Sequence, residues 1–387
     1  MQADTVLHVE ILVGLQFTSN HFTFHAVAFH CHLHTFCLPA LHISSVMNNN
    51  SGTPSYFEFT VFSDYGSLRY LFFCLCLLIY MTIISANLVI VLTVCVEKSL
   101  HQPMYIFICC LSLNSLYGSA GFFPRFLMDI LSDTHFISHP FCFLQIYIIH
   151  TYKVHELNIL TVMSYDRLVA ICQPLHYHRK MTFRTVLCLL SVVVLYPVSV
   201  FGYLFYLSIS LTLCGNELHR FFCTNWSVVQ LSCVDTTLIN IAGQFLGVAS
   251  TFTPLFFVLY TYLRILLVCK RSSSEFRGKA LQTCLPHIVT FVNYCISVFC
   301  EVSLSGNKNN EVNSFVIAVL SLEFLIIPPI SNPLVYALNL PQIRGVIFWS
   351  LRPNKHETLL NRYRPPNPAL SILQLGYGNP FHEALCS

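Results

Sequence analysis

Five long stretches of the chain contain no Asp, Glu, Lys or Arg, and this pattern constrains the fold more than any other feature. A transmembrane helix needs about 20 consecutive apolar residues, and a charge at the bilayer centre is costly. Only 10% of the residues are charged and 55% are hydrophobic, which is too few charges to cover a water-soluble surface. The chain is therefore predicted to be a membrane protein. The charge-free stretches are 70–96, 99–124, 185–216, 236–263 and 280–300.

Two further stretches are long enough to span a membrane but carry internal charges. Stretch 139–172 contains Lys153 and Glu156, and stretch 312–343 contains Glu323. Together with the five charge-free stretches, they predict an all-α membrane protein with a seven-transmembrane-helix bundle.

The basic residues predict the orientation of this bundle, because short cytoplasmic loops collect Lys and Arg. Most of the twenty Lys and Arg residues fall in one set of loops and in the C-terminal tail. The N-terminus is therefore predicted to lie outside the cell and the C-terminus in the cytoplasm. The exceptions on the other side or within the helices are Arg69, Arg125, Lys153, Arg220 and Lys308.

Three regions follow from this topology. Residues 1–67 are predicted to form an extracellular N-terminal segment, 68–343 a seven-helix domain, and 344–387 a cytoplasmic tail. The tail begins with a predicted amphipathic helix on the inner leaflet, because Val346, Ile347 and Leu351 share one face with Ile343.

A charge pair, Asp166 and Arg167, stands at the predicted cytoplasmic end of the third helix. Adjacent helical residues point about 100° apart, so Asp166 can hold Arg167 or a loop residue while Arg167 faces the bundle. Alternatively, Arg167 snorkels to the lipid headgroups. These residues alone leave both interpretations open.

Five motifs occur in order along the chain: "LHQPMYIF" (100–107), "MSYDRLVAICQPLHY" (163–177), "TYLRIL" (261–266), "KALQTCLPHIV" (279–289) and "PPISNPLVYALNLPQIR" (328–344). Together they resemble the odorant receptors among the rhodopsin-like G-protein-coupled receptors. The resemblance covers roughly residues 50 to 350, and "LNSLYGSAGFFP" and "TNWSVVQLSCVDTT" look most like the fish branch. Chains of this family normally begin close to where Met47 stands, so residues 1–46, which are rich in His and Phe, are interpreted as an atypical leader segment.

The resemblance implies a switch between two packings of the bundle. Arg167 would be held by Asp166 at rest and turn toward Tyr262 when the sixth helix moves. A proline in a helix removes one backbone hydrogen bond, so the seventh helix would carry a kink that can rearrange. Its matching motif residues are Asn332, Pro333 and Tyr336.

The resemblance also implies the setting and the partners. We expect an odorant receptor, not an enzyme, in the plasma membrane of an olfactory sensory neuron. Its partners would be a small-molecule odorant, a heterotrimeric stimulatory G protein that raises cyclic AMP, and membrane lipid. No cofactor, metal or nucleic acid is expected. Ser115 departs from the family pattern, which often has Asp there, and this puts a sodium site in doubt because sodium favours carboxylate oxygens. Glu156 is a possible substitute.

Four of the eighteen cysteines, Cys142, Cys214, Cys223 and Cys233, fall on the predicted extracellular side. Four cysteines permit three pairings, and sequence alone does not choose among them. The resemblance favours Cys142 with Cys223 and Cys214 with Cys233, bonds that persist in an oxidising compartment.

Two glycosylation sequons, at Asn49 and Asn225, also fall on the predicted extracellular side. Asn49 precedes the first helix, whereas Asn225 stands beside Cys223 in a loop that disulfides would hold. Asn49 is therefore the stronger candidate.

Lys153 is a candidate ligand-binding residue, together with Glu156. Lys153 lies roughly 16 Å below Cys142 along the third helix, a depth at which an outward-facing pocket could end. An intramembrane charge indicates function, so Lys153 is predicted to attract a carboxylate or another anionic odorant. The alternative is that Lys153 and Glu156, three residues apart on one helical face, neutralise each other.

Other classes of protein fit less well. A transporter would show an internal repeat, and an enzyme would need convergent catalytic groups; the sequence shows neither. A zinc site from His25, His30, Cys31, His32 and His34 lacks zinc-finger spacing. A further alternative is a receptor of this fold that no longer signals.

Overall fold

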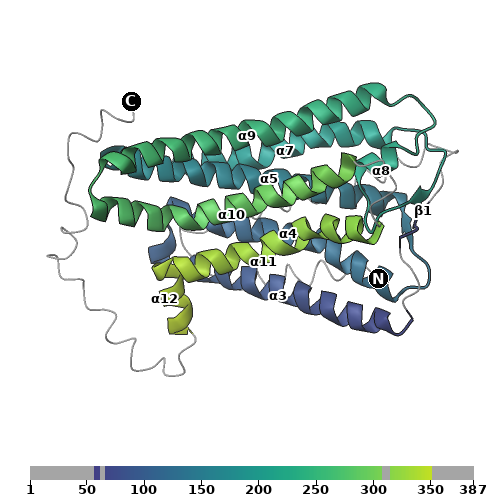
Figure 1. Ribbon diagram of the computed structural model, residues 1–387, viewed down its shortest axis with the longest axis horizontal. Coiled ribbons are helices and arrows are strands. Elements are labelled where there is room, and N and C mark those ends of the chain that lie inside the picture. The colour runs from purple at the N-terminus through teal and green to yellow at the C-terminus, as the bar shows by residue number, and fades with distance from the viewer. Residues whose placement is uncertain (1–55, 62–65, 307–313, 351–387) are drawn as a thin grey trace, which may run out of the picture. The chain divides into compact units, whose positions relative to one another are not determined.

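The computed structural model describes residues 56–61, 66–306 and 314–350, without the side chains of 279, 300–306, 314–321 and 349–350. Its described part contains seven long helices, and Figure 1 shows them running along a common direction. Five short helical segments connect or follow them: η2 (Lys98–Leu100), η3 (Pro174–His176), α6 (Tyr177–Lys180), α8 (Asn225–Val229) and α12 (Pro341–Ser350). The long helices are α3 (Leu68–Val96), α4 (Pro103–Leu131), α5 (His139–Cys172), α7 (Phe183–Ile209), α9 (Thr237–Arg271), α10 (Ser274–Gly306) and α11 (Ser314–Asn339).

The predicted spans agree with these helices in place and order, while several helix ends differ. Helix α5 has the bounds expected from the sequence. Helix α9 continues beyond its apolar stretch to Arg271, and α10 begins at Ser274, before its apolar stretch starts. A helix can extend past an apolar stretch when charged residues occupy its end turns. Asn49, the His-rich segment 1–46 and the distal tail lie outside the described residues.

Five of the described helices are long and apolar enough to cross a membrane, or six if α11 and α12, which meet at a bend of 91°, count as one span. Helix α5 is not among them, because it carries charged residues between its apolar ones. It packs against α4, α7, α9 and α10, so these residues meet protein. Both Glu156 and Asp166 are buried.

Helices α4 and α5 pack closely because two glycines on α4 leave room for side chains of α5. A Cβ at Gly118 would lie 2.5 Å from Cγ of Tyr152, and a Cβ at Gly121 would lie 2.3 Å from Cγ2 of Ile148. Neither space can hold a methyl group at normal contact distance. Glycine at these positions thus sets the separation of the two helices.

A three-stranded sheet lies at one end of the bundle, beside the start of α5, and the sequence did not predict it. Strand β1 (Tyr56–Phe59) is central, between β2 (Phe136–Ser138) and β3 (Glu217–Leu218). It pairs antiparallel with β2 and parallel with β3. We call this end, where the disulfides Cys142–Cys223 and Cys214–Cys233 also lie, the disulfide end. The opposite end, where Arg167 lies, is called the arginine end.

Candidate functional site

Asp166 is the centre of a small polar cluster at the arginine end. Its side chain is fully buried and accepts hydrogen bonds from Nε of Arg167 at 3.0 Å and from Oη of Tyr177 at 2.8 Å. A second guanidinium nitrogen of Arg167 also binds the carboxylate. Burial, and secondly the nearby carboxylate, raise the pKa of Tyr177, so its hydroxyl stays a donor at neutral pH. The sequence suggested the Asp166–Arg167 contact but not the part played by Tyr177, which closes the same motif.

An apolar cluster closes the seam between α5, α9 and α10 next to Arg167. Tyr262, the expected later partner of Arg167, packs against this cluster. The three helices are therefore in contact at the arginine end, and Arg167 is bound to Asp166 in this packing. The buried members are Ile171, Cys172, Ile265, Val268, Cys269, Ala280 and Cys284.

Helix α11, which contains Pro328, Pro329 and Pro333, receives a hydrogen bond from α3. Pro333 has no N–H, so the carbonyl of Pro329, four residues earlier, loses its helical donor. Nδ2 of Asn87 donates to this carbonyl at 2.8 Å. Asn87 was not among the residues predicted from the sequence, although a single Asn within an apolar span indicates a polar partner in the bundle.

Asn332 connects α11 to α5. Its Nδ2 donates to Oε1 of Glu156 at 2.8 Å, and Glu156 is only 1% exposed. Glu156 thus has a hydrogen-bond partner on α11 that the sequence did not predict. The hydroxyl of Ser115 donates to the Leu111 carbonyl of its own helix.

Tyr336 connects α11 to α10. Its hydroxyl lies 3.1 Å from Oγ1 of Thr290 and 3.3 Å from Nδ1 of His287, and all three residues are buried. The expected motif residues of α11 thus meet three neighbours: Asn332 meets α5, Tyr336 meets α10, and the carbonyl freed by Pro333 meets α3. Helix α11 is the element that joins these contacts.

Lys153 lies nearer to the disulfide end, among aromatic rings. Its Nζ is 5.1 Å from the centroid of the Phe324 ring, which is a cation–π distance. The same ring contacts those of Tyr152 and Tyr294, with centroids 5.2 Å and 5.9 Å away. One residue before Phe324, Glu323 accepts a hydrogen bond from Ser297 at 2.9 Å. A basic side chain, Lys153, and an acidic side chain, Glu323, therefore both lie where α5, α10 and α11 meet.

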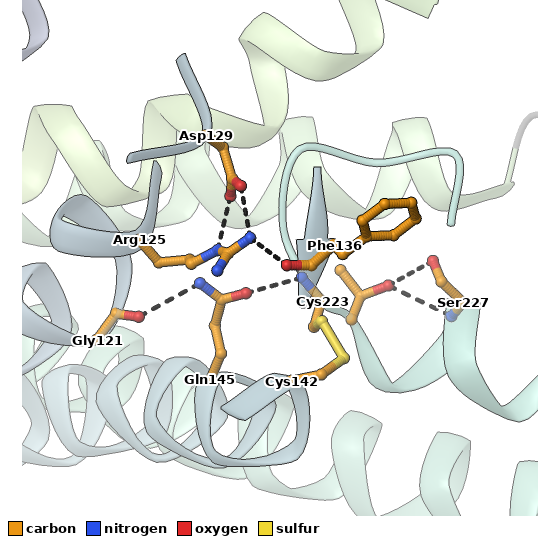
Figure 2. Close-up of a disulfide and its surroundings, with 9 residues drawn as sticks. Gly121, Arg125, Asp129, Phe136, Cys142, Gln145, Cys223 and Ser227 are labelled. Atoms are coloured by element: carbon orange, nitrogen blue, oxygen red, sulfur yellow. Dashed lines mark hydrogen bonds and ion pairs between the residues drawn. A yellow bond between two sulfur atoms is a disulfide. The ribbon is translucent and has the colours of Figure 1, made fainter. Parts of the chain in front are cut away.

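At the disulfide end, the structure contains both bonds that the resemblance favoured, Cys142–Cys223 and Cys214–Cys233. Figure 2 shows how side chains around the first bond hold the neighbouring loops. Gln145 accepts a hydrogen bond from the backbone N of Cys223 at 2.9 Å and donates to the Gly121 carbonyl at 3.4 Å.

Arg125 holds strand β2 in the same region. It forms an ion pair with Asp129 at 2.6 Å, and the same Nη2 donates to the Phe136 carbonyl at 2.6 Å (Figure 2). Asn225, the second sequon, begins the short helix α8, and the hydroxyl of Ser227 bonds to Thr224 in its N-cap.

Comparison with known proteins identifies the family. A family model described as olfactory receptor matches residues 73–353. The human "Olfactory receptor 6K3" is 34% identical over 316 residues, covering 79% of this chain and 92% of that receptor. The human "Olfactory receptor 51L1" is 33% identical over 282 residues, covering 70% of this chain and 86% of that receptor. The crystal structure of squid rhodopsin matches with a TM-score of 0.63 at 13% identity, covers 87% of this chain and 97% of that one, and so shows the fold. The chain therefore belongs to the olfactory receptor family, whose members are multi-pass seven-helix receptors of the rhodopsin fold and not enzymes.

Proposed function

We propose that this receptor binds a small organic odorant within the helix bundle and activates a stimulatory G protein, which raises cyclic AMP. The disulfide end would face the outside of an olfactory sensory neuron, and the arginine end would meet the G protein in the cytoplasm. Two observations support this orientation: disulfides persist in an oxidising compartment, and the loops at the arginine end carry most of the basic residues.

The observation that carries the proposal is the closed packing at the arginine end. Arg167 is bound to the buried carboxylate of Asp166, and the apolar cluster between α5, α9 and α10 fills the seam beside it. A G protein needs this seam to open. An odorant would promote opening by binding the open packing more tightly than the closed one, since a ligand shifts an equilibrium only by its difference in affinity.

Lys153 is the candidate that sets the odorant class. It is a cation among aromatic rings between the disulfide end and the Asn332–Glu156 contact. An anionic odorant would gain a charge-assisted hydrogen bond from its Nζ, while an apolar body would pack against rings such as Phe324. Carboxylates are therefore the first class to try.

The test is cyclic AMP in cells that express the receptor with an olfactory-type stimulatory G protein. The cells are exposed to hexanoate, hexanol, hexylamine and a set of amino acids. We expect hexanoate or another carboxylate to act on the unaltered receptor and to fail on Lys153→Ala. Arg167→Ala should abolish every response at normal surface expression. Arg69, which lies at the disulfide end at the start of α3, gives the control Arg69→Ala, which should respond normally because its surface ion pair with Asp133 contributes little.

Two outcomes would contradict the proposal in different ways. If Arg167→Ala responds as the unaltered receptor does, the switch assigned to Arg167 is wrong. If the receptor reaches the surface and couples to no G protein with any odorant class, it is a non-signalling receptor of the same fold. Uptake of a tested compound into cells without cyclic AMP would instead favour a transporter.

A further inference from the structure

Strand β1 joins two loops that do not pair with each other. The sheet order is β2-β1-β3, so the loop before α5 and the loop before α9 are connected in this sheet through β1 alone. Backbone hydrogen bonds run from Phe59 N to the His135 carbonyl at 3.0 Å and from Glu58 N to the Asn216 carbonyl at 2.8 Å. Removing β1 would leave β2 and β3 without a shared strand.

Two aromatic side chains dock β1 onto the bundle. Phe57 and Phe59, which share one face of the strand, are 0% and 2% exposed. The ring of Phe57 stacks on His139 with centroids 4.3 Å apart and an interplanar angle of 18°, and it meets the edge of Phe143 at 6.5 Å. His139 and Phe143 belong to the first turns of α5, so β1 rests directly on that helix.

The strands on either side of β1 are attached to the bundle through bonds that do not involve β1. Arg125 binds the carbonyl of Phe136 in β2, and the chain continues from β2 into α5. The loop that carries β3 is fixed by both disulfides and by the bond from Cys223 to Gln145 (Figure 2). Strand β1 is four residues long and contains no cysteine. Opening at β1 breaks backbone hydrogen bonds and ring contacts but no disulfide, whereas movement of the β3 loop away from α5 is limited by the Cys142–Cys223 bond.

We propose that β1 is the displaceable strand of a lid over the disulfide end, and that docking of Phe57 on His139 controls how fast small molecules enter the bundle. This inference rests on the proposed orientation, with the disulfide end outside. When Phe57 leaves its site, the two loops lose their common strand and separate, while the disulfides keep each loop attached. The lid then opens without unfolding the bundle.

A reporter cysteine tests this without any odorant. In a Lys153→Cys receptor, the permanently charged reagent 2-(trimethylammonium)ethyl methanethiosulfonate is added from outside, and the modified fraction at position 153 is followed by peptide mass spectrometry. The charge prevents passage through lipid, so the rate reports entry through the lid. Peptide-level detection separates this signal from the native cysteines.

Three variants are compared in this background. Phe57→Ala should speed modification by at least about tenfold, because truncating a buried Phe weakens the closed state by more than that factor. Phe141→Ala is the matched control, since Phe141 stands in the first turn of α5 but is 61% exposed, and it should stay within about twofold, as exposed substitutions usually do.

The cross-link Glu58→Cys with Phe136→Cys joins residues that face each other across β1 and β2, and it should slow modification. Each of its two single-cysteine variants should behave like the reporter alone. The cross-link also keeps the test decisive if Phe57→Ala does not reach the surface.

Equal rates in the reporter, in Phe57→Ala and in the cross-linked receptor would overturn the proposal. So would a complete lack of modification at position 153 in every variant, because displacing β1 would then open no path. Neither result depends on cyclic AMP or on an odorant, so a receptor that does not signal can still pass or fail this test.

Discussion

Replacing Gly121 with Ala should destabilise the receptor through a clash that can be located to one atom. The new Cβ would lie 2.3 Å from Cγ2 of Ile148 and 3.0 Å from its Cβ, whereas carbon atoms in contact sit about 3.5–4.0 Å apart. Ile is stiff at χ1, so Cγ2 cannot swing aside at small cost. Helices α4 and α5 must therefore separate by about 1 Å, and overpacking of this kind costs ~1–3 kcal/mol.

The assay is thermal unfolding of the purified receptor in detergent, with other helical glycines as controls. Gly202 and Gly243 have no atom within 4 Å of an added Cβ. Ala at these positions should leave stability unchanged or raise it by up to ~1 kcal/mol, because Ala is the better helix former. The double variant Gly121→Ala with Ile148→Ala should lose less stability than the two single effects added together. If Gly121→Ala unfolds at the same temperature as Gly202→Ala, the close approach of α4 and α5 is wrong.

Three further outcomes follow from the contacts of the bundle. Asp166→Asn should raise cyclic AMP in the absence of odorant, because Arg167 loses its anionic partner; unchanged basal output would contradict this. Asn87→Ala should lower unfolding stability by ~1 kcal/mol, since the Pro329 carbonyl loses its donor, and a thermal shift assay measures the loss. Asn225→Gln should leave the gel shift on glycosidase treatment unchanged, because Asn225 begins a short helix whose sequon hydroxyl is already bonded.

The spans could be predicted from the sequence because the cost of a charge in a bilayer acts on each residue separately. That cost located α3, α4, α7, α9 and α10 from the absence of charges alone. It did not locate the helix ends, since α9 continues into Lys270 and Arg271 once the chain has left the apolar stretch. Nor did it predict strand β1, whose alternating Tyr-Phe-Glu-Phe pattern is too short to distinguish from a loop.

The candidate site was predictable for residues whose chemistry is local. The sequence shows that Pro333 lacks an N–H, and hence that one carbonyl of α11 needs another donor. It does not show which helix supplies that donor, because the arrival of Asn87 depends on how α3 packs against α11. The same holds for Glu156, because the sequence does not show that Asn332 of α11 donates a hydrogen bond to it.

The contacts of α11 also bear on how strong an odorant's preference must be. Asn87, Asn332 and Tyr336 provide hydrogen bonds from α11 to three different helices, so a rigid shift of α11 breaks them together. Interhelical hydrogen bonds in membranes average about 0.6 kcal/mol, which makes the set worth roughly 2 kcal/mol. An odorant that binds the shifted packing about 30-fold more tightly would supply that amount, since each tenfold corresponds to about 1.4 kcal/mol. A small molecule with a few differential contacts can reach this preference, so the proposed switch would keep basal signalling low and still respond to such a ligand.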